Sequence, residues 1–156
     1  MKRKITCHLF WVVFLLLLVS CGGDRWSYVS RQTGISFPEP IALTQSDDHG
    51  GFHGDGMLRV EMRFAAEDGA SLPARLEKSG WVSVGEANGP VKSAYERELQ
   101  AENLPECSEG LLWFLDRADQ SSENGKRPFE ERYSYNYSVA LYDSANAALY
   151  YLEIDT

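Results

Sequence analysis

Residues 47 to 56 gather side chains that can bind a metal ion or move a proton. This segment, DDHGGFHGDG, holds three carboxylates, two histidines and four glycines. Imidazole and carboxylate groups together suit a divalent transition metal such as zinc or manganese, and they also suit general acid–base chemistry. The glycines would let backbone N–H groups approach a ligand closely. The candidate ligand or metal loop therefore comprises Asp48, His49, His53 and Asp55, with a metal ion at His49 and His53 as its cofactor.

A purely structural role explains the same segment. Its glycines would supply turns, its aspartates would bond to the local backbone, and Phe52 would enter the core. The mature chain offers no third histidine for a closed structural zinc site, and the segment lacks the spacing of a calcium loop. Both interpretations stay open, and the structural one is favoured.

A second candidate is the pair Asp116 and Arg117, which follows the apolar run 111–115. Loops at the ends of buried strands often carry binding residues, although an internal Asp116–Arg117 ion pair or a solvated turn is the more ordinary interpretation. The stripe Tyr133, Tyr135 and Tyr137 could stack on a sugar or a peptide, but such a stripe is more typical of a core. No nucleophile elbow, phosphate loop or metalloprotease helix occurs in the sequence.

The first twenty residues have the pattern of a signal peptide. A basic start at residues 2–4 precedes an apolar run of eleven residues, 9–19, which is too short to cross a bilayer. Residues 18–21, LVSC, resemble the lipobox of bacterial lipoproteins. That resemblance implies cleavage before Cys21, acylation of Cys21, and a protein held by lipid on the extracytoplasmic face of the membrane in the bacterial cell envelope. The alternative is an ordinary signal anchor in which Cys21 is incidental.

Charge and cysteine content narrow the class of protein. The whole chain has a net charge of -8, and loss of residues 1–20 removes three basic and no acidic residues, which leaves 12 basic against 23 acidic side chains, or -11. Such a chain is repelled by nucleic acid, so we exclude nucleic acid as a partner. Once Cys21 carries lipid, Cys107 has no partner for an internal disulfide, and we expect it to be a half-buried, unreactive thiol.

The pattern of the remaining residues predicts one α+β domain with a mainly antiparallel sheet and about two helices. We expect a tether at 21–34 and a globular domain at 35–156, with strands at 41–44, 57–64, 81–84 and 111–115 and helices at 74–79 and 93–103. Bulky side chains occupy alternate positions of residues 132–142, and a second strand-like run, 147–154, follows after turn residues. This pattern predicts a C-terminal β-hairpin. We expect both helices on its aromatic face, solvent on the other face, and 111–115 at the centre of the sheet.

Residues 48–56 together with the ending YD…LYYLEIDT resemble a family of short uncharacterised bacterial proteins, many of them exported or lipid-anchored. The resemblance covers most of the mature chain and includes Asp116-Arg117 and the strand 133–142. It implies that the glycine-rich loop is a shared signature and supports the hairpin. It implies no activity.

We therefore expect a membrane-anchored extracytoplasmic binding or interaction module, with the membrane as partner through Cys21 and a protein or small molecule as ligand. One alternative is a small metal-dependent or acid–base hydrolase that uses Asp48, His49, His53 and Asp55. Another is an immunity-type lipoprotein, whose acidic surface would suit a basic secreted protein. The oligomeric state is left open.

Overall fold

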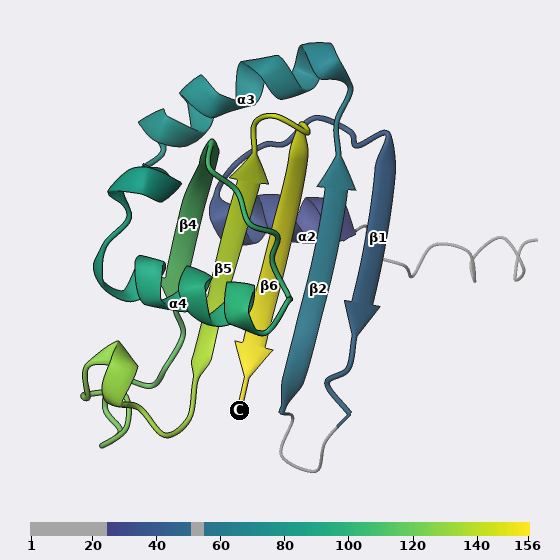
Figure 1. The fold of residues 1–156 in the computed structure, drawn as a ribbon. Coiled ribbons are helices and arrows are strands. Elements are labelled where there is room, and N and C mark those ends of the chain that lie inside the picture. Colours follow the sequence, from purple (N-terminus) through teal and green to yellow (C-terminus); the bar gives the residue numbers. More distant parts are fainter. Residues whose placement is uncertain (1–24, 51–54) are drawn as a thin grey trace, which may run out of the picture.

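A six-stranded antiparallel sheet with the order β1-β2-β6-β5-β4-β3 forms the centre of the computed structural model (Figure 1). The structure describes residues 25–50 and 55–156. Its strands are β1 (Ala42–Asp47), β2 (Gly56–Arg63), β3 (Val82–Ser83), β4 (Gly110–Asp116), β5 (Asn136–Asp143) and β6 (Ala148–Asp155). Its helices are α2 (Arg25–Thr33), α3 (Ala66–Lys78) and α4 (Gly89–Gln100), with short 3-10 turns η1 (Val84–Glu86) and η2 (Phe129–Glu131). The predicted α+β class is confirmed, with three helices instead of two.

The C-terminal hairpin has the predicted form. Strands β5 and β6 pair antiparallel from Asp143↔Ala148 to Asn136↔Asp155 without a break in register. The Asp143 carboxylate accepts hydrogen bonds from the backbone N–H groups of Ala145 and Asn146, at 3.0 and 3.1 Å. An aspartate that bonds to the backbone of the next residues reverses the chain at a fixed point, so it sets the register of the two central strands.

Both faces of the sheet are covered, so the prediction of one solvent-exposed face is wrong. Helix α4 lies on one face and α2 on the other, while α3 runs along one end of the sheet (Figure 1). The core on the α2 side contains Val29, Leu72 and Leu76 from the helices, and the core on the α4 side contains Ala94 and Tyr95. Large side chains from the neighbouring strands occupy the space beside the small residues of β5. Ala140, for example, lies between Trp113 of β4 and Tyr151 of β6.

Residues 25–33 form helix α2 instead of a tether, so the described fold includes residues that precede position 35. Val29 is fully buried, and Trp26 and Tyr28 pack against the same core. The Trp26 indole N–H donates to the carbonyl of Phe37 at 3.1 Å. The burial of this apolar side of the helix outweighs the modest helix propensity of its serines and threonine.

Two further boundaries differ from the prediction. Helix α3 begins at Ala66, so Pro73 lies inside the helix and not in its first turn. Strand β4 is not central, because only the two-residue β3 separates part of it from the edge of the sheet, and Leu115 is 38% exposed. In the part of the chain that the structure describes, no helix has the length and apolar character that crossing a membrane requires.

Candidate functional site

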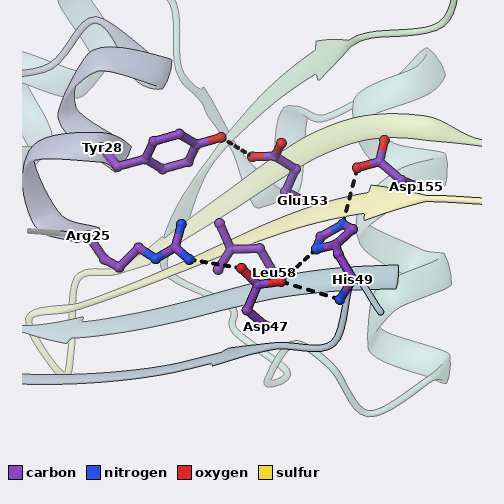
Figure 2. A pocket seen from close by; sticks show the side chains of 7 residues that line it. All are labelled: Arg25, Tyr28, Asp47, His49, Leu58, Glu153 and Asp155. Carbon is purple, nitrogen blue, oxygen red and sulfur yellow. Dashed lines mark hydrogen bonds and ion pairs between the residues drawn. The ribbon is translucent and has the colours of Figure 1, made fainter. Parts of the chain in front are cut away.

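A pocket of about 570 Å³ lies between α2 and the polar end of the sheet (Figure 2). We call it the α2 pocket. Its lining side chains are Arg25, Tyr28, Asp47, His49, Leu58, Glu153 and Asp155. Six of these seven side chains are polar or charged, so the pocket presents hydrogen-bonding groups around one apolar residue.

The antiparallel register explains why distant residues meet in this pocket. Asp47 of β1 pairs with Leu58 of β2, and Leu58 pairs with Glu153 of β6, so the three side chains lie in a row on one face. Asp155 follows Glu153 by two residues and therefore points to the same side. The row lies on the α2 side of the sheet because Leu58 belongs to the core that α2 covers.

His49 lies between two carboxylates. Its Nδ1 is 2.8 Å from the Asp47 Oδ1, and its Nε2 is 3.1 Å from the Asp155 Oδ2. Carboxylates only accept hydrogen bonds, so both ring nitrogens are satisfied together only when both carry a proton. The hydrogen bond to Asp47 is the main reason that the pKa of His49 is raised above its ordinary value, and partial burial opposes this effect.

Asp47 joins this histidine to helix α2. The Arg25 Nη2 donates to the Asp47 Oδ2 at 2.8 Å, while the other oxygen accepts from the ring and the backbone N–H of His49. These contacts lower the pKa of Asp47, with the hydrogen bond from the His49 ring as the largest cause. Asp47 is therefore held as a carboxylate between two cations.

Arg117 connects the carboxylates of Glu153 and Asp155 on β6. Its guanidinium forms ion pairs of 3.1 Å with Glu153 and 3.1 Å with Asp155. It also donates to the backbone carbonyl of Ile154 at 3.2 Å. An arginine that bridges two carboxylates and a carbonyl fixes their positions, because its planar fork of donors has a defined geometry.

Two tyrosines complete the network. The hydroxyls of Tyr28 and Tyr151 donate to the Glu153 Oε2 at 2.7 and 3.0 Å. Burial and then the bond to Glu153 raise the pKa of Tyr28 to about 12, so this phenol remains a donor at physiological pH. Figure 2 shows the resulting line of contacts from Arg25 through Asp47 and His49 to Asp155, with Tyr28 on Glu153 beside it.

The structure places the described residues of the predicted loop in two different pockets. His49 lies in the α2 pocket, whereas Asp48 and Asp55 line a second pocket of about 660 Å³ beside α4. The Asp48 N–H donates to the Met57 carbonyl at 3.2 Å, and the Asp48 carboxylate accepts the Met57 N–H, so Asp48 closes the β1–β2 connection. His53 lies outside the described residues, as does Cys21.

The described residues do not form a set of ligands for the predicted metal ion. Among residues 25–50 and 55–156, no group of three or more His, Cys, Asp or Glu side chains is arranged to hold a metal ion. His49 uses both ring nitrogens on carboxylates, so this conformation leaves no nitrogen lone pair for a cation. The metal site therefore stays a prediction that depends on His53.

Asp116 and Arg117 do not pair with each other, contrary to the interpretation favoured above. They are adjacent at the end of β4, so their side chains point to opposite faces. Arg117 supports the α2 pocket, whereas Asp116 accepts two bonds of 2.8 Å from the guanidinium of Arg132. Arg132 also donates to the carbonyls of Gly125 and Arg127, so this pair fixes the connection between β4 and β5.

The tyrosine stripe is mainly core. Tyr137 is fully buried, and the rings of Tyr135 and Tyr137 both pack on Phe129 with centroid distances of 5.2 and 5.3 Å. Tyr133 alone of the three is open to solvent, at 74% exposure. Cys107 is buried, and burial raises the pKa of its thiol, which agrees with an unreactive role.

Of the seven lining residues, only His49 belongs to the predicted candidate set, and Asp47 lies in the same segment of the sequence. Five lining residues lie outside that segment: Leu58, Arg25, Tyr28, Glu153 and Asp155. The last two had a usable signal, because acidic residues at alternate positions interrupt one face of an otherwise apolar strand. Arg25 and Tyr28 gave no such signal while residues 21–34 were interpreted as a tether.

Comparisons of the chain with protein-family models, with curated proteins and with solved structures found no match.

Proposed function

We propose that the protein is a lipid-anchored binding module of the bacterial cell envelope and that the α2 pocket is its ligand site. The proposal combines two independent features. The lipobox-like sequence at 18–21 supports an anchor at Cys21. The α2 pocket supplies fixed polar groups, and two of them, Arg25 and Tyr28, lie on the helix that follows the anchor in the sequence.

The observation that carries the proposal is the pairing of every charged side chain in the pocket. Asp47 is bound by Arg25 and His49, and both carboxylates of β6 are bound by Arg117. A general base needs a free lone pair directed at its substrate, and His49 offers none in this state. The lining, as the structure describes it, has no Ser, Thr or Cys that could act as a nucleophile. Fixed and paired charges favour recognition over catalysis.

The same pairing defines the class of ligand. A ligand with charge of one sign would compete with one member of a pair and leave the other member unpaired, which costs free energy in a partly buried site. A ligand with both signs can exchange partners with both members at once. We therefore propose a zwitterionic ligand such as a short peptide, with its carboxylate on Arg25 and its ammonium on Asp47 or Glu153.

The anchor would keep the pocket close to the membrane. Arg25 follows Cys21 by four residues, and four fully extended residues reach at most about 14 Å. Because α2 starts at Arg25, a lipid on Cys21 would hold the mouth of the pocket within this distance of its attachment point. The ligand would thus be taken from the layer next to the membrane.

A thermal-shift assay with a panel of uncharged-side-chain dipeptides tests the ligand class on the purified full chain. We expect the melting temperature of the wild type to rise with dipeptide concentration, because a ligand that binds only the folded state stabilises it. Arg25→Gln should lose most of this rise. Arg31→Gln is the matched control, because Arg31 lies on the same helix but is exposed outside the pocket. Equal responses of wild type and Arg25→Gln, or no response to any dipeptide, would exclude this ligand class.

The immunity-type function has one supporting observation, the net charge of -11 that remains after loss of residues 1–20. An acidic surface accelerates association with a basic protein, and salt weakens this effect. Binding of a basic secreted protein that weakens strongly with added salt and is unchanged in Arg25→Gln would favour this function over a dipeptide site.

The hydrolase alternative rests on the contact between His49 and Asp47, which is the kind of contact that orients a catalytic histidine. It requires that His49 release Asp155 and that His53 or a metal ion take part. Near-stoichiometric metal in the purified protein, lost in a His49→Ala, His53→Ala double variant that still folds, would support it.

A further inference from the structure

The second pocket, which we call the α4 pocket, lies on the side of the sheet that α4 covers. It has a volume of about 660 Å³. Its walls come from the C-terminal part of α4, from the start of β2 and from the end of β6. Asp155 is the one described lining residue that it shares with the α2 pocket, so the two pockets are separate sites.

The α4 pocket has an apolar wall. Met57 of β2 lies opposite Ile154 of β6 in the antiparallel ladder, and both side chains pack in the core on the α4 side. Ala101, directly after α4, lines the pocket from the helix side. Ligand sites typically combine such apolar surface with a few fixed polar groups, so this wall can bury the aliphatic part of a ligand.

Glu98 contributes a buried carboxylate to the lining of the α4 pocket. The residue is only 3% exposed. Its Oε1 accepts the Tyr137 hydroxyl, and its Oε2 accepts the Asn103 side-chain amide at 2.7 Å. Both donors are neutral, and within residues 25–50 and 55–156 no cation forms an ion pair with Glu98. Burial of a charge costs free energy unless an opposite charge accompanies it, so Glu98 is a buried anion without a counter-ion.

The other charged side chains of the pocket do not supply this counter-ion. Arg97 is the one cation of the described lining, and its guanidinium lies over the Tyr135 ring, 4.1 Å from the ring centroid. Asp48 and Asp55 add two carboxylates, and neither forms an ion pair with another described residue. Together with Glu98, the pocket therefore has three carboxylates without a bonded cation.

The positions of these carboxylates favour an extended cation over a metal ion. Metal ligands converge on one point, and no three His, Cys, Asp or Glu side chains do so in the part of the chain that the structure describes. Glu98 lies on the helix, whereas Asp48 and Asp55 belong to the connection between β1 and β2. The negative charges thus come from two walls, and a ligand with length can reach both.

We propose that the α4 pocket binds an organic ammonium ion with an aliphatic body. The ammonium group supplies the counter-ion that Glu98 lacks, and the methylene chain covers Met57 and Ile154. An ammonium group has three donors and no acceptor, so it suits carboxylates that have unused lone pairs. A free diamine and the lysine side chain of a peptide share this chemistry.

The α4 pocket is proposed independently of the ligand site in the α2 pocket. Each carboxylate of the α2 pocket already has a cation, because Asp47 is bound by Arg25 and the two carboxylates of β6 are bound by Arg117. An ammonium ion without a carboxylate therefore finds its unpaired anions in the α4 pocket, whereas a zwitterion suits the α2 pocket. The two sites differ in the class of ligand that they select.

Isothermal titration calorimetry of the purified full chain tests the site with two amines, cadaverine and Nα-acetyl-lysine amide. Pentanol and pentanoate are the controls, because they keep an aliphatic chain and replace the cation with a neutral or an anionic group. We expect heat of binding from at least one amine and from neither control. Binding of cadaverine alone identifies a free amine as the ligand, and binding of acetyl-lysine amide identifies a lysine side chain.

Two pairs of variants locate the binding. Glu98→Gln should weaken amine binding by about tenfold or more, whereas Glu96→Gln should not, because Glu96 is an exposed residue of the same helix outside the pocket. Ala101→Lys places a competing ammonium in the pocket at an exposed position, so it should abolish binding in a chain that folds. Gln100→Lys is its matched control, because this exposed neighbour does not line the pocket.

Three results would overturn the proposal: no heat from either amine, equal binding of pentanol, or equal amine affinity of Ala101→Lys and Gln100→Lys. Ala101→Lys also separates the two sites. It should lose amine binding and keep the rise in melting temperature that dipeptides cause at the α2 pocket.

Discussion

The hydroxyl of Tyr142 on β5 donates a hydrogen bond of 2.8 Å to the backbone carbonyl of Gly69 inside helix α3. Pro73 lies four residues after Gly69 in the same helix and has no N–H to donate to that carbonyl. The tyrosine therefore replaces a missing helical hydrogen bond. This contact explains how a proline is accommodated inside α3, and it attaches the helix to a central strand of the sheet.

Replacement of Tyr142 by Phe should lower the free energy of unfolding by about 1 to 2 kcal/mol, because the buried Gly69 carbonyl loses its donor. Pro73→Ala restores a backbone N–H at the position that can reach Gly69. The Tyr142→Phe penalty should therefore be smaller in the Pro73→Ala background. Urea denaturation of the four proteins of this double-mutant cycle measures the coupling, and strictly additive effects would disprove it.

The ion pair between Asp116 and Arg132 should stabilise the fold more than the exposed ion pair between Arg127 and Glu123 does. Arg132→Gln leaves the Asp116 carboxylate without its two charge-assisted bonds, and we expect a loss of about 2 to 3 kcal/mol in urea denaturation. Arg127→Gln is a suitable control, because Arg127 forms an exposed pair with Glu123 and should change stability by less than about 0.5 kcal/mol. Equal losses of unfolding free energy in Arg132→Gln and Arg127→Gln would show that the Asp116–Arg132 ion pair is not specially stabilising.

The same pair should affect stability in acid. Arg132 is the largest cause of the lowered pKa of Asp116, so the carboxylate stabilises the fold at pH values above its unfolded pKa. This contribution is lost as the pH falls from about 4 through the lower folded value. Asp116→Asn should lose stability at neutral pH and show a smaller further loss in acid than the wild type, as measured by denaturation at several pH values.

His49 should give the opposite dependence on pH. Its folded pKa is raised, so the contribution of the charged ring is complete below the unfolded value of about 6.5 and is lost as the pH rises through the folded value. The free energy of unfolding should therefore fall in the wild type as the pH rises above about 6.5, and it should fall less in His49→Gln. A wild-type stability that rises across this range, or one that His49→Gln leaves unchanged, would show that His49 is not held between Asp47 and Asp155.

The anchor is tested by Cys21→Ser. We expect the wild-type chain to incorporate labelled palmitate and to sediment with membranes, and the variant to remain unlabelled as an unprocessed precursor. Cys107→Ser controls for the loss of a thiol, because Cys107 is buried in the core. Equal labelling and processing of wild type and Cys21→Ser would show that Cys21 does not carry a lipid anchor.

The parts of the fold that could be predicted are those with a local pattern. The alternation in 57–64 and 132–154 gave strands β2, β5 and β6, since a strand with one core face repeats every two residues. Helix α2 has no comparable local signal, because Val29 is buried only by a sheet that forms far along the chain. Similarly, the position of Pro73 suggested a helix start, and the helix extends before it while the distant Tyr142 supplies the hydrogen bond that Gly69 cannot receive from Pro73.

The candidate site shows the same limit. His49 could be selected from the sequence by its residue type, but its partners Asp47 and Asp155 are 108 residues apart and meet only through the register of β1, β2 and β6. Sequence reasoning grouped Asp48 and Asp55 with His49 because they are close in the chain. Alternation along the strand sends neighbours to opposite faces, so closeness in sequence was misleading there.

The most direct test of the proposed recognition site is nitrogen NMR of the His49 ring, with His53→Gln to remove the other histidine of residues 21–156. We predict that both His49 ring nitrogens carry protons at pH values where a free histidine is already neutral, and that a bound dipeptide shifts both signals while Arg25→Gln suppresses this response. A neutral ring with one unprotonated nitrogen, unaffected by dipeptides, would contradict the account and favour a catalytic or metal-binding histidine.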